Sequence, residues 1–117
     1  MIQWKTDLAG VEGGATAQGY AIDSKGSMDT YRPHTSASFN IPCRVKISGD
    51  IMIVTYDQDG EHCVYKGDMN GRGHFELHAV NFDGQATLHF IENDTVLEGS
   101  WLEGNYGGMW KIKLLPE

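Results

Sequence analysis

Apolar and polar residues alternate along the chain from about Ala37 to Leu115, and turn signals interrupt the alternation at nearly even intervals. Alternation of period two is typical of strands with one buried face, and helical spacing is not sustained in this region. The turn pairs suit short hairpin loops, and they are Gly49-Asp50, Asp59-Gly60, Asn70-Gly71, Asp83-Gly84, Asn93-Asp94 and Gly104-Asn105. The pattern therefore predicts about seven consecutive antiparallel strands.

Two-residue turns, with a four-residue loop at Gly104 to Gly107 in the last hairpin, keep the apolar residues of neighbouring strands on one common face. The predicted facing pairs are Val45–Val54, Ile47–Met52, Leu77–Phe90, Ala79–Leu88, Phe90–Leu97, Trp101–Trp110, Gly99–Ile112 and Leu97–Leu114. A wrong register would move apolar residues to the other face, so this agreement supports the strands. Only at Asn70-Gly71 does a two-residue turn misplace an apolar residue, Phe75, and a bulge or longer loop is expected there.

The pattern is weaker before Ala37. The alternation continues upstream of Val45 and puts Phe39 on the apolar face, although Pro42 implies an edge position, a bend or a bulge. Residues 15–22 are a candidate for a further strand, and residues 24–36 are predicted as a loop.

The predicted fold is all-β: an antiparallel up-and-down meander of about eight strands, closed or nearly closed as a barrel. A long meander must either close or protect its edge strands, which favours closure. The 117 residues suffice for one core and not for two, so a single domain over residues 1–117 is expected, with residues 1–36 partly loop.

Charge and composition narrow the function. Sixteen acidic against nine basic residues give a formal net charge of −7, and the basic residues are scattered, which argues against nucleic-acid and membrane partners. The chain starts without a signal-peptide pattern, and two cysteines do not make a disulfide framework of the secreted kind. A cytoplasmic location is expected, and nothing in the sequence implies a cofactor.

The apolar face would line the inside of the barrel. An eight-stranded barrel is either filled by its side chains or holds one small ligand, and both alternatives are open. The candidate residues for a pocket are the large aromatic ones on this face: Tyr56, Tyr65, Phe75, Phe90, Trp101 and Trp110.

Two G-x-W triplets close the sequence pattern, Gly99-Ser100-Trp101 and Gly108-Met109-Trp110. A small meander barrel with such tryptophans resembles the calycin group, which includes lipocalins, fatty-acid-binding proteins and avidins. The resemblance covers the chain from about Ala37 to Leu115. It departs from the lipocalin pattern, in which G-x-W lies on the first strand, so it implies the fold type and no binding residue.

The outer face offers a different chemistry. With tight turns on both sides, His78, His89 and Glu98 form a row across three strands, and two imidazoles with a carboxylate suit Zn, Cu or non-haem Fe. The alternative is an ordinary solvated sheet face.

Cys43 and Cys63 point inward by parity with Tyr56 between them, and two strand spacings are too far for a disulfide, so free buried thiols are expected.

Three functions are therefore open. The first is a non-catalytic barrel that binds a small, largely apolar ligand or serves as an interaction module. The second is a metal-dependent enzyme that uses the histidine row. The third is a structural dimerisation domain, for which the outward apolar pairs Ile91–Val96 and Leu102–Met109 would supply a homodimer patch.

Overall fold

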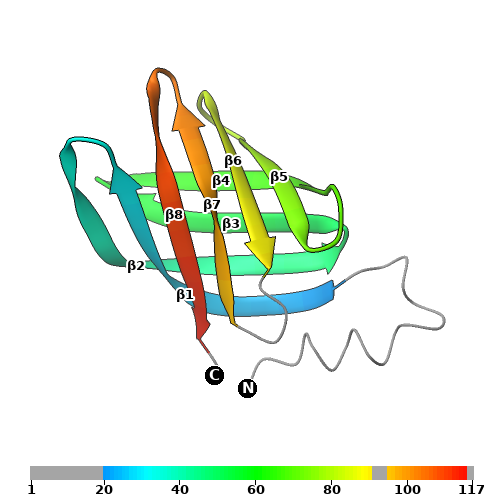
Figure 1. Ribbon diagram of the computed structural model, residues 1–117. Coiled ribbons are helices and arrows are strands. Elements are labelled where there is room, and N and C mark those ends of the chain that lie inside the picture. Colours follow the sequence, from blue (N-terminus) through cyan, green and yellow to red (C-terminus); the bar gives the residue numbers. More distant parts are fainter. Residues whose placement is uncertain (1–19, 91–94, 116–117) are drawn as a thin grey trace.

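The computed structural model describes residues 20–90 and 95–115, which form eight strands. These are β1 (Tyr20–Arg32), β2 (Thr35–Gly49), β3 (Ile51–Gln58), β4 (Glu61–Met69), β5 (His74–Ala79), β6 (Gly84–Phe90), β7 (Val96–Glu103) and β8 (Tyr106–Leu115). Each strand pairs antiparallel with the next one along the chain, and β8 pairs with β1, which closes the barrel (Figure 1). The predicted all-β up-and-down barrel is confirmed.

Apolar side chains fill the inside of the barrel. On β2, Val45 and Ile47 are buried while their neighbours Arg44 and Lys46 are exposed, as period-two alternation requires. The largest side chains with under 2% exposure come from many strands and include Met28, Ile47, Met52, Tyr65, Phe75, Leu77, Leu88, Leu97, Ile112 and Leu114. No helix in the described part of the chain is long and apolar enough to span a membrane.

The loop predicted over residues 24–36 is wrong, because most of this segment belongs to the first strand. β1 runs to Arg32 and pairs with both β2 and β8, so it is the strand that closes the barrel. Its inward positions include Ser24 and Gly26 in place of large apolar residues. A Cβ on Gly26 would lie 2.9 Å from the Cys43 sulfur, so the closing strand needs a small residue there. Because several inward residues of β1 are small or polar, this part of the sequence lacks the alternation of apolar and polar residues by which a strand is recognised.

A bulge on β2 corrects the predicted inward position of Phe39. Asn40 has a positive φ of 60°, and the pairing of β1 with β2 shifts register around it. The extra residue turns Phe39 outward, where it is 58% exposed and packs edge-on against Tyr31 with ring centroids 5.9 Å apart. The bend or bulge predicted from Pro42 is therefore present, two residues upstream.

The loop between β5 and β6 is longer than the predicted two-residue turn. Leu77 pairs with Ala86 and not with Phe90, a shift of four residues along β6. The backbone N–H of Val80 donates to the Val64 carbonyl (2.8 Å), and the ring of Phe82 packs edge-on against Tyr65. These contacts hold the loop against β4. An even shift leaves every side chain on its predicted face, so the apolar pattern could not detect it.

The hairpin of β7 and β8 has a tight turn at Gly104-Asn105, where a four-residue loop was predicted. Each tryptophan therefore faces a glycine: Trp101 pairs with Gly108, and Trp110 pairs with Gly99. The predicted Trp101–Trp110, Gly99–Ile112 and Leu97–Leu114 pairs are wrong.

Several other register predictions are confirmed. The pairs Val45–Val54, Ile47–Met52 and Phe90–Leu97 form as expected. A longer loop lies between Met69 and Phe75, which pair with each other.

The up-and-down order places four connections at one end of the barrel (Figure 1). We call this end the mouth. It carries the turns at Pro33-His34, Asp59-Gly60 and Gly104-Asn105 and the loop of residues 80–83.

Candidate functional site

A small hollow of about 70 Å³ opens at the mouth. Its walls come from the ends of β1, β3, β7 and β8, and the lining residues are Thr30, Arg32, Tyr56, Gln58, Trp101, Glu103 and Trp110. Three residues of the predicted pocket line this hollow, and a fourth, Tyr65, donates its hydroxyl hydrogen bond to Glu103. The remaining two, Phe75 and Phe90, pack edge-on against each other (6.2 Å between centroids) and do not line it.

The sequence patterns missed the polar half of this hollow. Thr30 and Arg32 lie in the segment that was predicted as a loop, and Gln58 and Glu103 are each the last residue of a strand before a hairpin turn. Polar residues at strand ends are ordinary, so only the closed arrangement of the strands marks these four as neighbours. In the sequence, the signal that could have found these four residues is that each lies at or near the end of a strand that leads into a hairpin turn.

Thr30, one of the lining residues of the hollow, carries a buried polar atom without a hydrogen-bond partner. The residue is only 8% exposed, and its Oγ1 has no hydrogen-bond partner among the described residues. Leaving a buried hydroxyl without a partner costs about 1–3 kcal/mol. A ligand group that bonds to this hydroxyl would recover that free energy.

The two tyrosines at the mouth stay protonated at neutral pH. Burial raises the pKa of Tyr65, and its hydrogen bond to the Glu103 carboxylate raises it further. Burial also raises the pKa of Tyr56, and the sulfur of the neighbouring Cys63 adds to the effect. Both phenols are therefore hydrogen-bond donors, and Tyr56 is among the residues that line the hollow.

The cysteines are free thiols, as predicted. Tyr56 pairs with both Cys43 and Cys63 across its two neighbouring strands, which confirms the predicted row. Burial raises the pKa of Cys63 above its usual value, so its sulfur is a thiol and a weak nucleophile at neutral pH.

Trp101 forms a fixed aromatic wall of the mouth. Its indole N–H donates to the Met109 carbonyl (3.2 Å), and a Cβ added to Gly108 would lie 2.6 Å from the ring. The indole therefore lies directly on the Gly108 backbone, while Trp110 donates its own N–H to Thr87 (2.9 Å). Both indole N–H groups are therefore already bonded within the barrel, and Trp101, the more exposed of the two rings, offers a ligand its apolar surface.

A larger groove of about 600 Å³ adjoins the hollow. It lies between the β1–β2 and β7–β8 hairpins, and its lining residues are Arg32, Pro33, His34, Thr35, Trp101, Glu103, Asn105, Tyr106 and Gly107. The groove and the hollow share Arg32, Trp101 and Glu103. We refer to the two spaces together as the mouth site.

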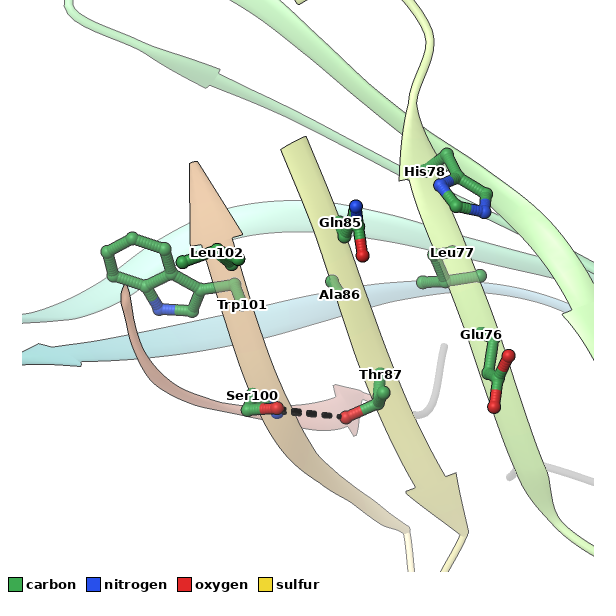
Figure 2. A pocket seen from close by; sticks show the side chains of 9 residues that line it. All are labelled: Glu76, Leu77, His78, Gln85, Ala86, Thr87, Ser100, Trp101 and Leu102. Carbon is green, nitrogen blue, oxygen red and sulfur yellow. Dashed lines mark hydrogen bonds between the residues drawn. The ribbon is translucent and has the colours of Figure 1, made fainter. Parts of the chain in front are cut away.

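A third hollow of about 330 Å³ lies on the outer face of β5, β6 and β7 (Figure 2). Polar and apolar residues line it, and the Thr87 and Ser100 hydroxyls lie 3.3 Å apart in its floor. Figure 2 shows His78 on β5 across from Gln85 on β6, and these two residues are paired in the sheet. In this floor the backbone N–H of Ser100 also donates to the Thr87 hydroxyl (3.1 Å), so these groups already have partners.

The predicted histidine row does not form as expected. His89 pairs with Glu98, which confirms half of the row, but its partner on β5 is His74 and not His78. The longer loop between β5 and β6 causes this shift. The rings of His74 and His89 lie 5.7 Å apart, and among the described residues no group of three His, Cys, Asp or Glu side chains has the geometry to hold a metal.

Exposed apolar side chains lie on the outer face near the mouth. Phe39 contacts Tyr31, and Tyr31 pairs with Met109, which is 54% exposed. The predicted Leu102–Met109 pair is wrong, since Leu102 pairs with Gly107, and Ile91 of the other predicted pair lies outside the described residues. The homodimer stays a prediction.

Comparison with known protein families found no match, and the search of curated proteins also found none. The barrel geometry and the mouth site therefore carry the functional argument.

Proposed function

We propose that this protein is a non-catalytic binding protein that takes a small molecule at the mouth of its barrel. The observation that carries the proposal is Thr30, whose buried hydroxyl has no partner among the described residues and which lines a hollow together with four further polar side chains and two indoles. Pockets that combine apolar walls with a few convergent polar groups are the usual sites of small ligands.

The sequence predicted a largely apolar ligand inside the barrel. Two observations favour the mouth instead: residues such as Met28, Met52 and Leu88 occupy the interior with 0% exposure, and the hollows lie where the strands end. The ligand we propose therefore presents a polar group to Thr30, Arg32 and Glu103 and rests its remaining part on Trp101.

The absence of catalysis is part of the proposal. Both mouth tyrosines are held protonated and the Cys63 thiol has a raised pKa, so none of the three is an activated nucleophile. Eight antiparallel strands in up-and-down order also support our inference that the barrel is of the calycin type.

A thermal-shift screen of chemically diverse small molecules tests the function. A ligand at about a hundred times its Kd stabilises the folded state by about 2.7 kcal/mol, which raises the Tm by roughly 10 °C or more. We expect the Thr30→Val variant to lose most of this shift, because it keeps the shape of the side chain and removes the hydroxyl. A shift of equal size in Thr30→Val would contradict the mouth as the binding site.

A further inference from the structure

Two opposite charges face the mouth site. Arg32 and Glu103 each line both the hollow and the groove, and no ion pair within 4.0 Å joins them in the described part of the chain. They also act in opposite directions on the pKa of Tyr56, which lines the same hollow. A charged ligand would be attracted by one of these groups and repelled by the other, so neither sign of charge is selected. Removing the ligand's own charge from water costs free energy that an uncharged ligand does not lose, so the site favours an uncharged ligand.

The hydrogen-bonding groups of the site are of mixed type. Arg32 only donates, the Glu103 carboxylate only accepts, and the Thr30 hydroxyl and the Gln58 amide do both. A ligand hydroxyl donates and accepts at the same time, so it can bond to any of these groups. A ligand that carries several hydroxyls around a ring would satisfy the set without a charge of its own.

The Trp101 ring supplies the apolar side of the site. Its position is fixed by the bond to Met109 and by contact with Gly108, so it loses little conformational freedom when a ligand binds. A sugar ring has one face of C–H groups that can cover such a flat apolar surface, while its hydroxyls point outward from the rim.

The sizes of the two spaces agree with this kind of ligand. The hollow of about 70 Å³ has room for one hydroxyl-bearing edge, and the groove of about 600 Å³ has room for the rest of a ring and a second one. From charge, hydrogen bonding, the indole surface and size together, we propose that the mouth site binds an uncharged saccharide whose terminal ring stacks on Trp101. This rests on the proposed function.

The first experiment screens the labelled full chain on a glycan array that contains neutral, acidic and amino sugars. Titration then follows with the neutral saccharides that bind, and with glucuronic acid, glucosamine, adenosine and lauric acid. We expect neutral saccharides to bind, and each charged analogue to bind at least tenfold more weakly.

Variants then locate the site. Trp101→Ala is expected to weaken saccharide binding at least tenfold, and Trp101→Phe, which keeps a ring, much less. Gln85→Ala in the outer hollow is the matched control and should leave the Kd within twofold. Amide chemical-shift changes in the unaltered protein provide a second readout, and they should cluster at the ends of β1, β3, β7 and β8.

The outcomes separate the two proposals. Binding of lauric acid, adenosine or a charged sugar at the mouth, without binding of any neutral saccharide, overturns the saccharide inference and leaves the proposed function standing. Saccharide binding whose shift changes fall on the outer face of β5–β7 overturns both. Failure of the array and of every compound in the thermal screen also overturns both.

Discussion

Gly99 shows how a missing side chain arranges its neighbours. A Cβ at this position would collide with the carbonyl oxygen of Thr87 on β6. That carbonyl accepts the indole N–H of Trp110, the β8 residue paired with Gly99. The indole therefore reaches across β7 to the next strand. The Thr87 hydroxyl also accepts a hydrogen bond from the backbone N–H of Ser100 (3.1 Å), which joins β6 and β7 next to Gly99.

The two tryptophans consequently have different roles. Trp110 is 2% exposed, contacts the ring of Tyr65 (5.4 Å between centroids) and has its N–H satisfied inside the barrel. Trp101 is half-buried and borders open space. The first is a structural residue and the second is placed for contact with a ligand.

We expect Trp110→Ala to lower the free energy of unfolding by about 3–5 kcal/mol, because it removes a fully packed ring and leaves a cavity. Trp101→Ala should cost less, about 1–3 kcal/mol, because part of its ring surface faces the groove. Urea denaturation of both variants measures the difference. Equal losses would contradict the division of roles between the two rings.

At the scale of the strand, side-chain alternation predicted which face each residue occupies far better than it predicted partners. Leu77 was placed inside correctly, yet its predicted partner was Phe90 and its actual partner is Ala86. Loop length decides the partner, and the β5–β6 loop is held by contacts of Val80 and Phe82 with β4. Such contacts join residues distant in sequence, so a turn pair such as Asp83-Gly84 does not reveal them.

The sequence predicted aromatic residues of the mouth site and missed its polar residues, for a related reason. Tyr56 and Trp110 belong to regular alternating strands, so parity alone places them inside. Thr30 and Arg32 belong to the strand that closes the barrel, and several of its inward residues, such as Ser24 and Gly26, are small or polar. Closure is a property of the whole sheet and leaves no local apolar pattern.

The β2 bulge predicts that the face on which a phenylalanine lies, and not its hydrophobicity alone, decides how much its substitution destabilises the protein. Phe39→Ser should change the free energy of unfolding by no more than about 0.5 kcal/mol, because the ring is exposed outside the barrel. Phe75→Ala, at a position with 0% exposure, is the matched comparison and should cost about 3–5 kcal/mol. Both are measured by urea denaturation. A loss in Phe39→Ser close to that of Phe75→Ala would mean that Phe39 lies inside and that Asn40 forms no bulge.

For the whole molecule, closure makes the interior a single low-dielectric core in which ionisation is unfavourable. Cys43 lies in this core beside Gly26 and is 8% exposed. Burial raises the pKa of its thiol from 9.0 to about 12. The folded protein therefore keeps this proton at pH values where the unfolded chain has released it.

The sign of the pH dependence follows from that difference. Below about pH 9 both states are protonated, and Cys43 contributes no pH dependence. Between about pH 9 and 12 the unfolded chain binds fewer protons, so the free energy of unfolding falls as pH rises, by at most about 1.4 kcal/mol per pH unit from this group.

We expect urea midpoints to fall between pH 9 and 10.5 and Cys43→Ala to reduce the slope, whatever its effect on the midpoint at pH 7. Cys63, Tyr56 and Tyr65 also have raised pKa values and contribute with the same sign, so Cys43→Ala reduces the slope without abolishing it. Identical slopes in the two proteins would show that the Cys43 thiol ionises in the folded state as easily as in water, and that the barrel is open to solvent at that position.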